Sequence, residues 1–372
     1  MYASNVPGGI AEKRMGTIFK ISSAFIGILI GAGFASGQEI LQYFTSFGIK
    51  GTVGAVISVI LFGYMGMTLM KLGIRTQTDS HQEAIVRISG KHLGRVIDYI
   101  LVVILFGIGV VMIAGSGSIF RQQFGIPEIA GTVLMTLLVL ATVMSNVDQV
   151  VKVIALVTPF LIFVVIFLFI YSMFTMDVSF SELDMLAKEQ PSAAGHWLVS
   201  AINYVSLAIA MGASMTLVMG GDESNERIAS IGGLVGGVGV GILVIMSHLA
   251  IFANIDQLAG LDMPSLGLAN QISPVLGIVY SIVLLGMIFN SAVSMFFSLG
   301  TRFFKPKTKK FNGFVFIVLL IGFFASFFGF TQLVSFLYPL FGYLGLLLIG
   351  ILVVSSFRMK SFGKSADQKK IV

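Results

Sequence analysis

The chain has 372 residues, of which 56% are hydrophobic and only 11% charged, and its mean hydropathy is +0.98. Soluble domains carry about 25% charged residues, so this composition excludes a soluble protein and predicts a multi-pass integral membrane protein. The net charge of +6 comes from basic residues dispersed among short loops, which does not indicate nucleic-acid binding. The absence of cysteine excludes disulfides, thiolate metal sites and cysteine nucleophiles.

Ten apolar stretches are long enough to cross a hydrocarbon core, which takes about 20 helical residues. They lie near residues 17–47, 51–72, 96–120, 128–146, 153–175, 196–219, 228–252, 274–300, 312–330 and 332–356. Met1–Lys20 is polar and mixed in charge, so we expect the first stretch to be a transmembrane span and not a signal peptide. The sequence thus predicts an all-α bundle of ten transmembrane helices.

The basic residues predict the orientation of this bundle. With the N-terminus inside, 20 of the 23 Lys and Arg residues are cytoplasmic, and Lys50, Arg121 and Lys188 are outside. Because cytoplasmic loops are enriched in Lys and Arg, we expect both termini in the cytoplasm. Residues 1–16 would form the cytoplasmic N-terminus, and residues 357–372 a basic cytoplasmic tail.

The ten spans divide into two sets of five, residues 17–175 and 196–356, joined by an external loop over 176–195. An odd number of spans gives the two sets opposite orientations in the membrane. This arrangement is the one required for an inverted repeat of the kind found in secondary transporters. Sequence similarity between the two halves is too weak to add support.

The first span contains the segment GAGFASGQE at Gly31–Glu39. The glycines alone could form a small-residue packing face, but packing does not explain the polar residues that follow them. A helix broken over residues 31–37 explains both, since unwound backbone at membrane depth is tolerated where it lines a cavity. Freed amides and a positive helix end would then face a carboxylate. The candidate substrate-binding residues here are Gly31, Ala32, Gly33, Phe34, Ala35, Ser36, Gly37 and Gln38.

Glu39 lies just past the predicted break, near mid-membrane, where a carboxylate is costly. We keep two roles open for it. Either it stays ionised and caps exposed amides at the start of the outer half-helix, or desolvation lets it carry a coupled proton.

The sixth span occupies the position where the repeat requires a second break, and it is interrupted by AIAMGAS at Ala208–Ser214. One glycine in a membrane helix is ordinary, so a packing role remains open.

The eighth span carries Ser291, Ser294 and Ser298 on one helical face, with Asn290 one turn from Ser294. Such serines often only bond back to the preceding helical turn. Facing an unwound segment, they could instead complete an oxygen shell for a hard cation. We therefore consider a Na⁺ site that joins Ser291 and Ser294 to carbonyls of the first span, with Asn290 and Glu39 as further coupling-ion candidates.

The segment AFIGILIGAGFASGQEILQYF resembles the first span of the YkvI-type bacterial membrane proteins. These proteins are grouped at a distance with the amino acid–polyamine–organocation superfamily, which has the LeuT-type fold. The resemblance implies that Gly31, Ala32 and Gly33 receive a substrate carboxylate. The segment VSLAIAMGASMTL resembles the broken sixth span of that fold. This resemblance implies five further substrate-binding candidates, Ala210, Met211, Gly212, Ala213 and Ser214. In sodium-coupled members, hydroxyls of the eighth span join the ion site.

Together these features predict an alternating-access transporter of a small organic solute, an amino acid or related zwitterion, by cation symport across a bacterial cytoplasmic membrane. Some proton-coupled relatives carry a mid-span lysine in the fifth span, where this chain has only Lys152 at the start, which favours Na⁺ over H⁺. We expect no organic cofactor, no enzymatic activity, no obligatory protein partner, and contact with membrane lipid. A non-transporting solute sensor and a channel remain the alternatives.

Overall fold

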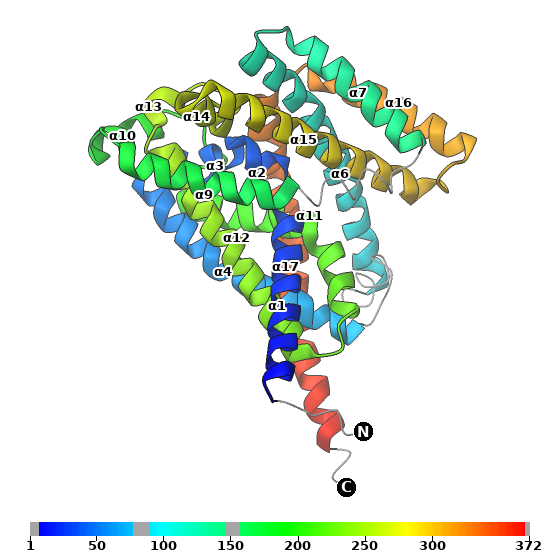
Figure 1. The fold of residues 1–372 in the computed structure, drawn as a ribbon. Coiled ribbons are helices and arrows are strands. Elements are labelled where there is room, and N and C mark those ends of the chain that lie inside the picture. Colours follow the sequence, from blue (N-terminus) through cyan, green and yellow to red (C-terminus); the bar gives the residue numbers. More distant parts are fainter. Residues whose placement is uncertain (1–6, 77–89, 146–156, 369–372) are drawn as a thin grey trace, which may run out of the picture.

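The computed structural model describes residues 7–76, 90–145 and 157–368, and all regular secondary structure in these ranges is helical (Figure 1). The long helices of the first half are α1 (Pro7–Leu29), α4 (Ile49–Thr76), α6 (Lys91–Phe124), α7 (Glu128–Met144) and α9 (Val157–Thr175). Those of the second half are α11 (Trp197–Gly221), α12 (Glu226–Phe252), α15 (Pro274–Phe303), α16 (Lys309–Ser326) and α17 (Phe330–Gln368). Shorter elements connect them, namely α2 (Ala32–Ser36), α3 (Gln38–Tyr43), η1 (Thr45–Phe47), α10 (Phe180–Lys188), α13 (Ile255–Leu258) and α14 (Pro264–Ile272).

An all-helical membrane protein is confirmed. Within the described ranges, six helices are long and apolar enough to cross a membrane, and a seventh if the bent helix α11 counts as one span. The other predicted spans are an interrupted one, α1 to α3, and two shorter apolar helices, α7 and Pro159–Thr175 of α9. The count of ten spans therefore stays a prediction.

Two boundaries differ from the sequence prediction. Helix α1 begins at Pro7 instead of near residue 17, and α17 continues past residue 356 to Gln368. Polar residues can continue an α-helix beyond the membrane. Hydropathy therefore identifies only the part of a helix that can lie in lipid. Residues 77–89 and 146–156, at two predicted inner loops, lie outside the described residues.

The long helices pack in two groups. Helices α1, α4, α11 and α12 form one group, in which α4 packs most extensively against α12 and α11. Helices α6, α7, α15 and α16 form the other, and α17 lies against α11 and α6. Small residues allow the closest approach of α4 to α12, where Gly66 and Gly233 meet backbone to backbone.

The short helices α10, α13 and α14 lie at the end of the bundle away from the two chain ends (Figure 1). Their polar contacts hold the loops together at this end. Lys188 pairs with Asp184, and Asp184 also accepts a hydrogen bond from the Ile49 N–H (2.9 Å). The hydrogen bond from Lys188 lowers the pKa of Asp184. The segment 254–273 contains two short helices, α13 and α14.

Candidate functional site

The first predicted span is broken in the structure. Helix α1 ends at Leu29, and the chain resumes helical geometry at Ala32 in the single turn of α2. Gly37 then takes the left-handed conformation (φ 82°) and separates α2 from α3. Across the first gap, the N–H of Ala35 donates to the carbonyl oxygen of Gly31 at 3.1 Å. The interruption predicted over residues 31–37 is thus present, with a short helical turn inside it.

Side-chain hydroxyls bond the carbonyl groups that this break frees. The Ser36 hydroxyl donates to the Gly33 carbonyl (2.6 Å) and accepts from the Gln38 N–H (3.1 Å). The Tyr280 hydroxyl, on α15, donates to the Ala35 carbonyl at 2.5 Å. Two of the carbonyls expected to face a cation therefore already accept hydrogen bonds from the protein.

Gly37 fits its position for two reasons. Its φ of 82° is one that residues with a Cβ adopt at a cost. A Cβ there would also lie 2.8 Å from the backbone nitrogen of Ser265, at the start of α14. The second turn of the break is therefore held directly against the segment that covers it.

Glu39 folds back toward the centre of the break. A Cβ added to Gly33 would collide with the Glu39 carboxylate and would lie 3.0 Å from the Tyr338 hydroxyl. The carboxylate consequently occupies the volume beside the bare Gly33 backbone. The other residues of α2 are also buried. The Glu39 side chain thus lies inside the break, and not in solvent beyond the break.

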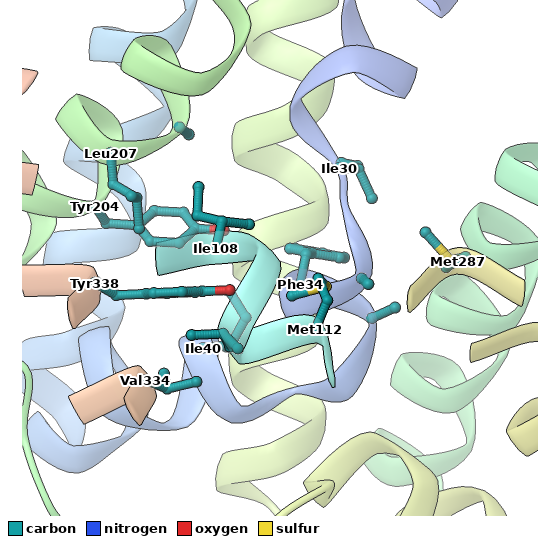
Figure 2. Packing of buried hydrophobic residues seen from close by; sticks show 14 of the residues in the cluster. Ile30, Phe34, Ile40, Ile108, Met112, Tyr204, Leu207, Met287, Val334 and Tyr338 are labelled. Carbon is teal, nitrogen blue, oxygen red and sulfur yellow. The ribbon is translucent and has the colours of Figure 1, made fainter. Parts of the chain in front are cut away.

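Two tyrosines from distant parts of the chain complete the surroundings of Glu39. The hydroxyls of Tyr204 on α11 and Tyr338 on α17 lie near its carboxylate, where they can act as hydrogen-bond donors. Tyr204 also lies in an aromatic cluster, with its ring centroid 5.2 Å from those of Tyr43 and Phe44. Figure 2 shows the two tyrosine rings extending toward Phe34 from their helices. Apolar side chains line the rest of this region, namely Ile30, Phe34, Ile40, Ile108, Met112, Leu207, Met287 and Val334.

The charge of Glu39 has no counterpart in the protein around it. With 8% of its surface exposed, it is the only Asp, Glu, Lys or Arg side chain buried in the ranges that the structure describes. No ion pair in those ranges involves it. An ionised carboxylate removed from water is costly unless it is paired, so this position requires a proton or a cationic group from outside the protein.

A hydrogen-bond network fixes the two helices that bring the tyrosines. The Tyr43 hydroxyl donates to Asn203 Oδ1 (3.0 Å), and Asn203 Nδ2 donates to the Pro339 carbonyl (3.0 Å). The Ser206 hydroxyl donates to the Gly342 carbonyl at 2.6 Å. Because Asn203 precedes Tyr204 and Pro339 follows Tyr338, these bonds set the spacing of α11 and α17 at the Glu39 site.

Gln38 faces away from Glu39. It is buried, and with its amide nitrogen turned toward α14 it donates to the carbonyls of Leu261 and Asp262 (both 3.3 Å) and accepts from Gln42 Nε2 (2.9 Å). Its observed contacts are with Gln42 and with the segment that covers the break. None of these contacts is with the carboxylate of Glu39.

The sixth predicted span changes direction at the end of the segment where the sequence predicts a break, although its helix runs from Trp197 to Gly221. Helix α11 bends by 55° between Trp197–Ala213 and Met215–Gly221. The bend lies at the end of the predicted segment: Ala210 and Ala213 are buried, Met211 is half-buried, and Gly212 faces Ile28 and Leu29 at the end of α1. The side chain of Ser214 lies outside the described residues. These residues adjoin the first break from its α1 side.

The polar residues of the eighth span are not joined to the break by any hydrogen bond in the described ranges. Asn290, Ser291 and Ser294 are half-buried on α15, and the Asn290 Oδ1 atom is buried without a partner. The observed link from α15 to the break is Tyr280, which lies several turns earlier in the helix. A cation site at Ser291 and Ser294 stays a prediction.

Sequence reasoning missed five residues of this site, Tyr43, Asn203, Tyr204, Tyr280 and Tyr338. One signal in the sequence was the position of two tyrosines. Tyrosines in membrane proteins are enriched at the membrane–water interfaces, but Tyr204 and Tyr338 lie in the interiors of predicted spans. That pattern could have identified them as polar groups turned inward. It could not have paired them with Glu39.

No protein-family model matches the chain. It is 28% identical over 347 residues to the uncharacterized membrane protein YkvI of Bacillus subtilis (strain 168), covering 92% of this chain and 97% of that protein. It is 24% identical over 331 residues to the uncharacterized protein YyaD of the same organism, covering 88% and 94% of the two chains.

Two solved structures share the fold. The match to the inward-facing conformation of Mhp1 covers 91% of this chain and 75% of the Mhp1 chain, with a TM-score of 0.59 and 13% identity. The match to MhsT in complex with L-phenylalanine covers 90% of this chain and 91% of the MhsT chain, with a TM-score of 0.60 and 18% identity. The broken first span and this likeness define an all-helical membrane protein of the LeuT fold. The chain is a homologue of the YkvI membrane protein.

Proposed function

We propose that this protein is a secondary active transporter that moves a small organic solute by alternating access, coupled to a cation. The observation that carries the proposal is the break in the first span, which surrounds a buried carboxylate with no cationic partner in the described protein. Broken spans at corresponding positions are a feature of transporter binding sites. Homology to a membrane protein and a fold shared with Mhp1 and MhsT support the same class.

The packing of the helices supports a repeat of five plus five spans. If each span of the first half corresponds to one of the second, α1 with α12 should match α11 with α4, and both pairs are in extensive contact. By the same correspondence, α6 with α7 matches α15 with α16, and α6 with α16 matches α15 with α7. All four of these pairs are also in contact, as a two-fold related structure requires.

The ends of the molecule support the proposed orientation. The two chain ends lie at the same end of the bundle (Figure 1). The three basic residues expected outside are close to the opposite end: Lys188 is on α10, Lys50 adjoins the Ile49–Asp184 contact, and Arg121 pairs with Asp262 just before α14. We propose a bacterial cytoplasmic membrane with both termini inside. Labelling of single cysteines in the cysteine-free chain would test this, with a cysteine at Asp256 reacting from outside and one at Thr308 from inside.

The solute and the coupling cation are narrower proposals. An amino acid or related zwitterion is the first candidate, and MhsT, which shares the fold, has been solved with L-phenylalanine. Sodium at Ser291 and Ser294 is the proposed coupling ion, with a proton on Glu39 as the alternative. Ser291→Ala with Ser294→Ala should raise the sodium concentration for half-maximal uptake, whereas uptake that needs no sodium would exclude this ion.

A solute sensor or a channel with the same pocket would behave differently. In proteoliposomes that contain unlabelled solute, a transporter accumulates external label by counterflow, and the uptake saturates. A sensor binds label without moving it, and a channel conducts without saturation and without dependence on a cation gradient. Counterflow that saturates is the expected result, and its absence with a solute that binds would reject transport.

A further inference from the structure

The position beside the Gly33 backbone is occupied by the protein itself. Broken helices attract anionic groups to this kind of position, because amides there lack backbone partners. Here the Glu39 carboxylate fills the volume that a Cβ on Gly33 would enter, and the Tyr338 hydroxyl is 3.0 Å from that point. The chain thus brings its own carboxylate to the place where a zwitterion would bring one.

A second carboxylate at this place would be unfavourable. It would lie beside Glu39, and two carboxylates that share a site repel each other unless one of them takes up a proton. The described ranges offer no buried Lys or Arg to pair with the additional negative charge. The site therefore disfavours a ligand that carries a carboxylate next to its amino group.

An ammonium group fits the same surroundings. It would pair with Glu39, which has no ionic partner among the described residues, and so take the place of the proton that this buried carboxylate otherwise requires. The rings of Tyr204 and Tyr338 offer faces that attract cations. The neighbouring side chains, Phe34, Met112 and Leu207 among them, are apolar and suit a hydrocarbon body (Figure 2).

We propose that Glu39 replaces the ligand carboxylate, so that the transported solute is a small apolar amine without a carboxylate of its own. Tyr204 and Tyr338 hold the carboxylate in place and cover the ammonium group. This inference rests on the proposed transport function, because it names the solute class of the same site. It replaces the amino acid named above as the first candidate solute with the amine that remains when the carboxylate is removed.

Matched pairs of compounds test the proposal, because each pair differs only in the carboxylate. The pairs are ethylamine with alanine, 3-methylbutylamine with leucine, and 2-phenylethylamine with phenylalanine, and L-phenylalaninamide keeps the bulk of phenylalanine without its charge. Binding to the purified full-length protein would be measured by thermal shift and by calorimetry. We expect at least one amine to bind about tenfold or more tightly than its amino acid, and L-phenylalaninamide to exceed phenylalanine.

Variants assign the effect to Glu39. Glu39→Gln should reduce amine affinity about tenfold or more, whereas Glu182→Gln, the same change at an exposed position on α10, should leave it unaltered. Tyr338→Phe keeps the carboxylate and removes one hydroxyl, so it should reduce amine affinity less than Glu39→Gln does. If Glu39→Gln does not fold, the compound pairs and Tyr338→Phe still decide the proposal.

The outcomes separate this inference from the transport proposal. Amino acids that bind as tightly as their amines, failure of every amine to bind, or full amine affinity in Glu39→Gln would overturn the inference. Saturable counterflow of an amino acid would overturn it while supporting transport. Amine binding that depends on Glu39, without counterflow, would support it and reject transport.

Discussion

The first and the sixth predicted spans change direction by different means. The first is divided into three helices, with Gly37 in a left-handed conformation and hydroxyls of Ser36 and Tyr280 on its freed carbonyls. The sixth is one helix, α11, that bends by 55°. The two spans therefore contribute different groups to the site. The first span provides bare backbone and the carboxylate. The sixth provides Tyr204, which lies near that carboxylate, and Asn203, which bonds to Tyr43 and to the Pro339 carbonyl.

The largest effect should come from Gly37→Ala, which attacks the feature that α11 lacks. A Cβ there requires an unfavourable φ and overlaps the start of α14, so we expect a loss of about 2 kcal/mol or more in the free energy of unfolding. Denaturation of the purified protein in mixed SDS micelles would measure it. Gly286→Ala, at a position on α15 with open space around it, is the matched control and should cost nothing. Equal stability of the two variants would contradict this account of the break.

Gly33→Ala should act on binding more than on stability. The new methyl group would displace the Glu39 carboxylate, which is the end of a side chain and can move, so we expect the affinity for 2-phenylethylamine to fall about tenfold. Shortening the acid makes room for the methyl group. Gly33→Ala combined with Glu39→Asp should therefore bind more tightly than Gly33→Ala alone. Failure of this rescue in a folded double variant would mean that the two side chains do not compete for one volume.

Tyr280→Phe should have a moderate effect on stability. It removes the hydroxyl that donates to the Ala35 carbonyl at 2.5 Å and leaves that buried carbonyl without this partner. The expected loss is about 1–3 kcal/mol of unfolding free energy, measured as for Gly37. Tyr99→Phe, at an exposed position on α6, serves as the control and should be neutral.

The smallest effect should come from Gly212→Ala in α11. A Cβ there meets the side-chain ends of Leu29 and Ile28, which can shift, and the helix itself favours alanine over glycine by about 1 kcal/mol. We expect a change below about 1 kcal/mol in unfolding free energy, with amine binding retained. A loss of stability as large as that of Gly37→Ala would show that α11 depends on its glycine as the first span does.

The helical fold and the first break could be predicted from the sequence because their signals are local. Twenty or so apolar residues predict a membrane helix, and three glycines followed by Ser36, Gln38 and Glu39 are difficult to place in an unbroken one. The bend in α11 was predicted within a few residues from its small residues. Its smaller extent could not be predicted, because small residues permit a break in a helix without requiring one.

The partners of Glu39 could not be predicted, because Tyr204 and Tyr338 come from helices far away in the chain. Their meeting depends on how α11 and α17 pack, and helical periodicity describes one helix at a time. The same limit applies to Tyr280. Its hydroxyl donates to the Ala35 carbonyl, which belongs to the group of first-span carbonyls that were expected to face a cation. A row of serines on α15 showed a shared face, and a shared face does not identify the neighbour that it contacts.

The close approach of Gly33 to Glu39 limits how this sequence can diverge. A side chain at position 33 and a long acidic side chain at position 39 compete for one volume, so evolution can change either position freely only after the other has changed. Homologues should accordingly fall into two groups, those with Gly at 33 and Glu at 39, and those with a larger residue at 33 and a shorter or uncharged one at 39. In an alignment of many such sequences the two positions would covary, and the group to which a homologue belongs would indicate the charge of its solute.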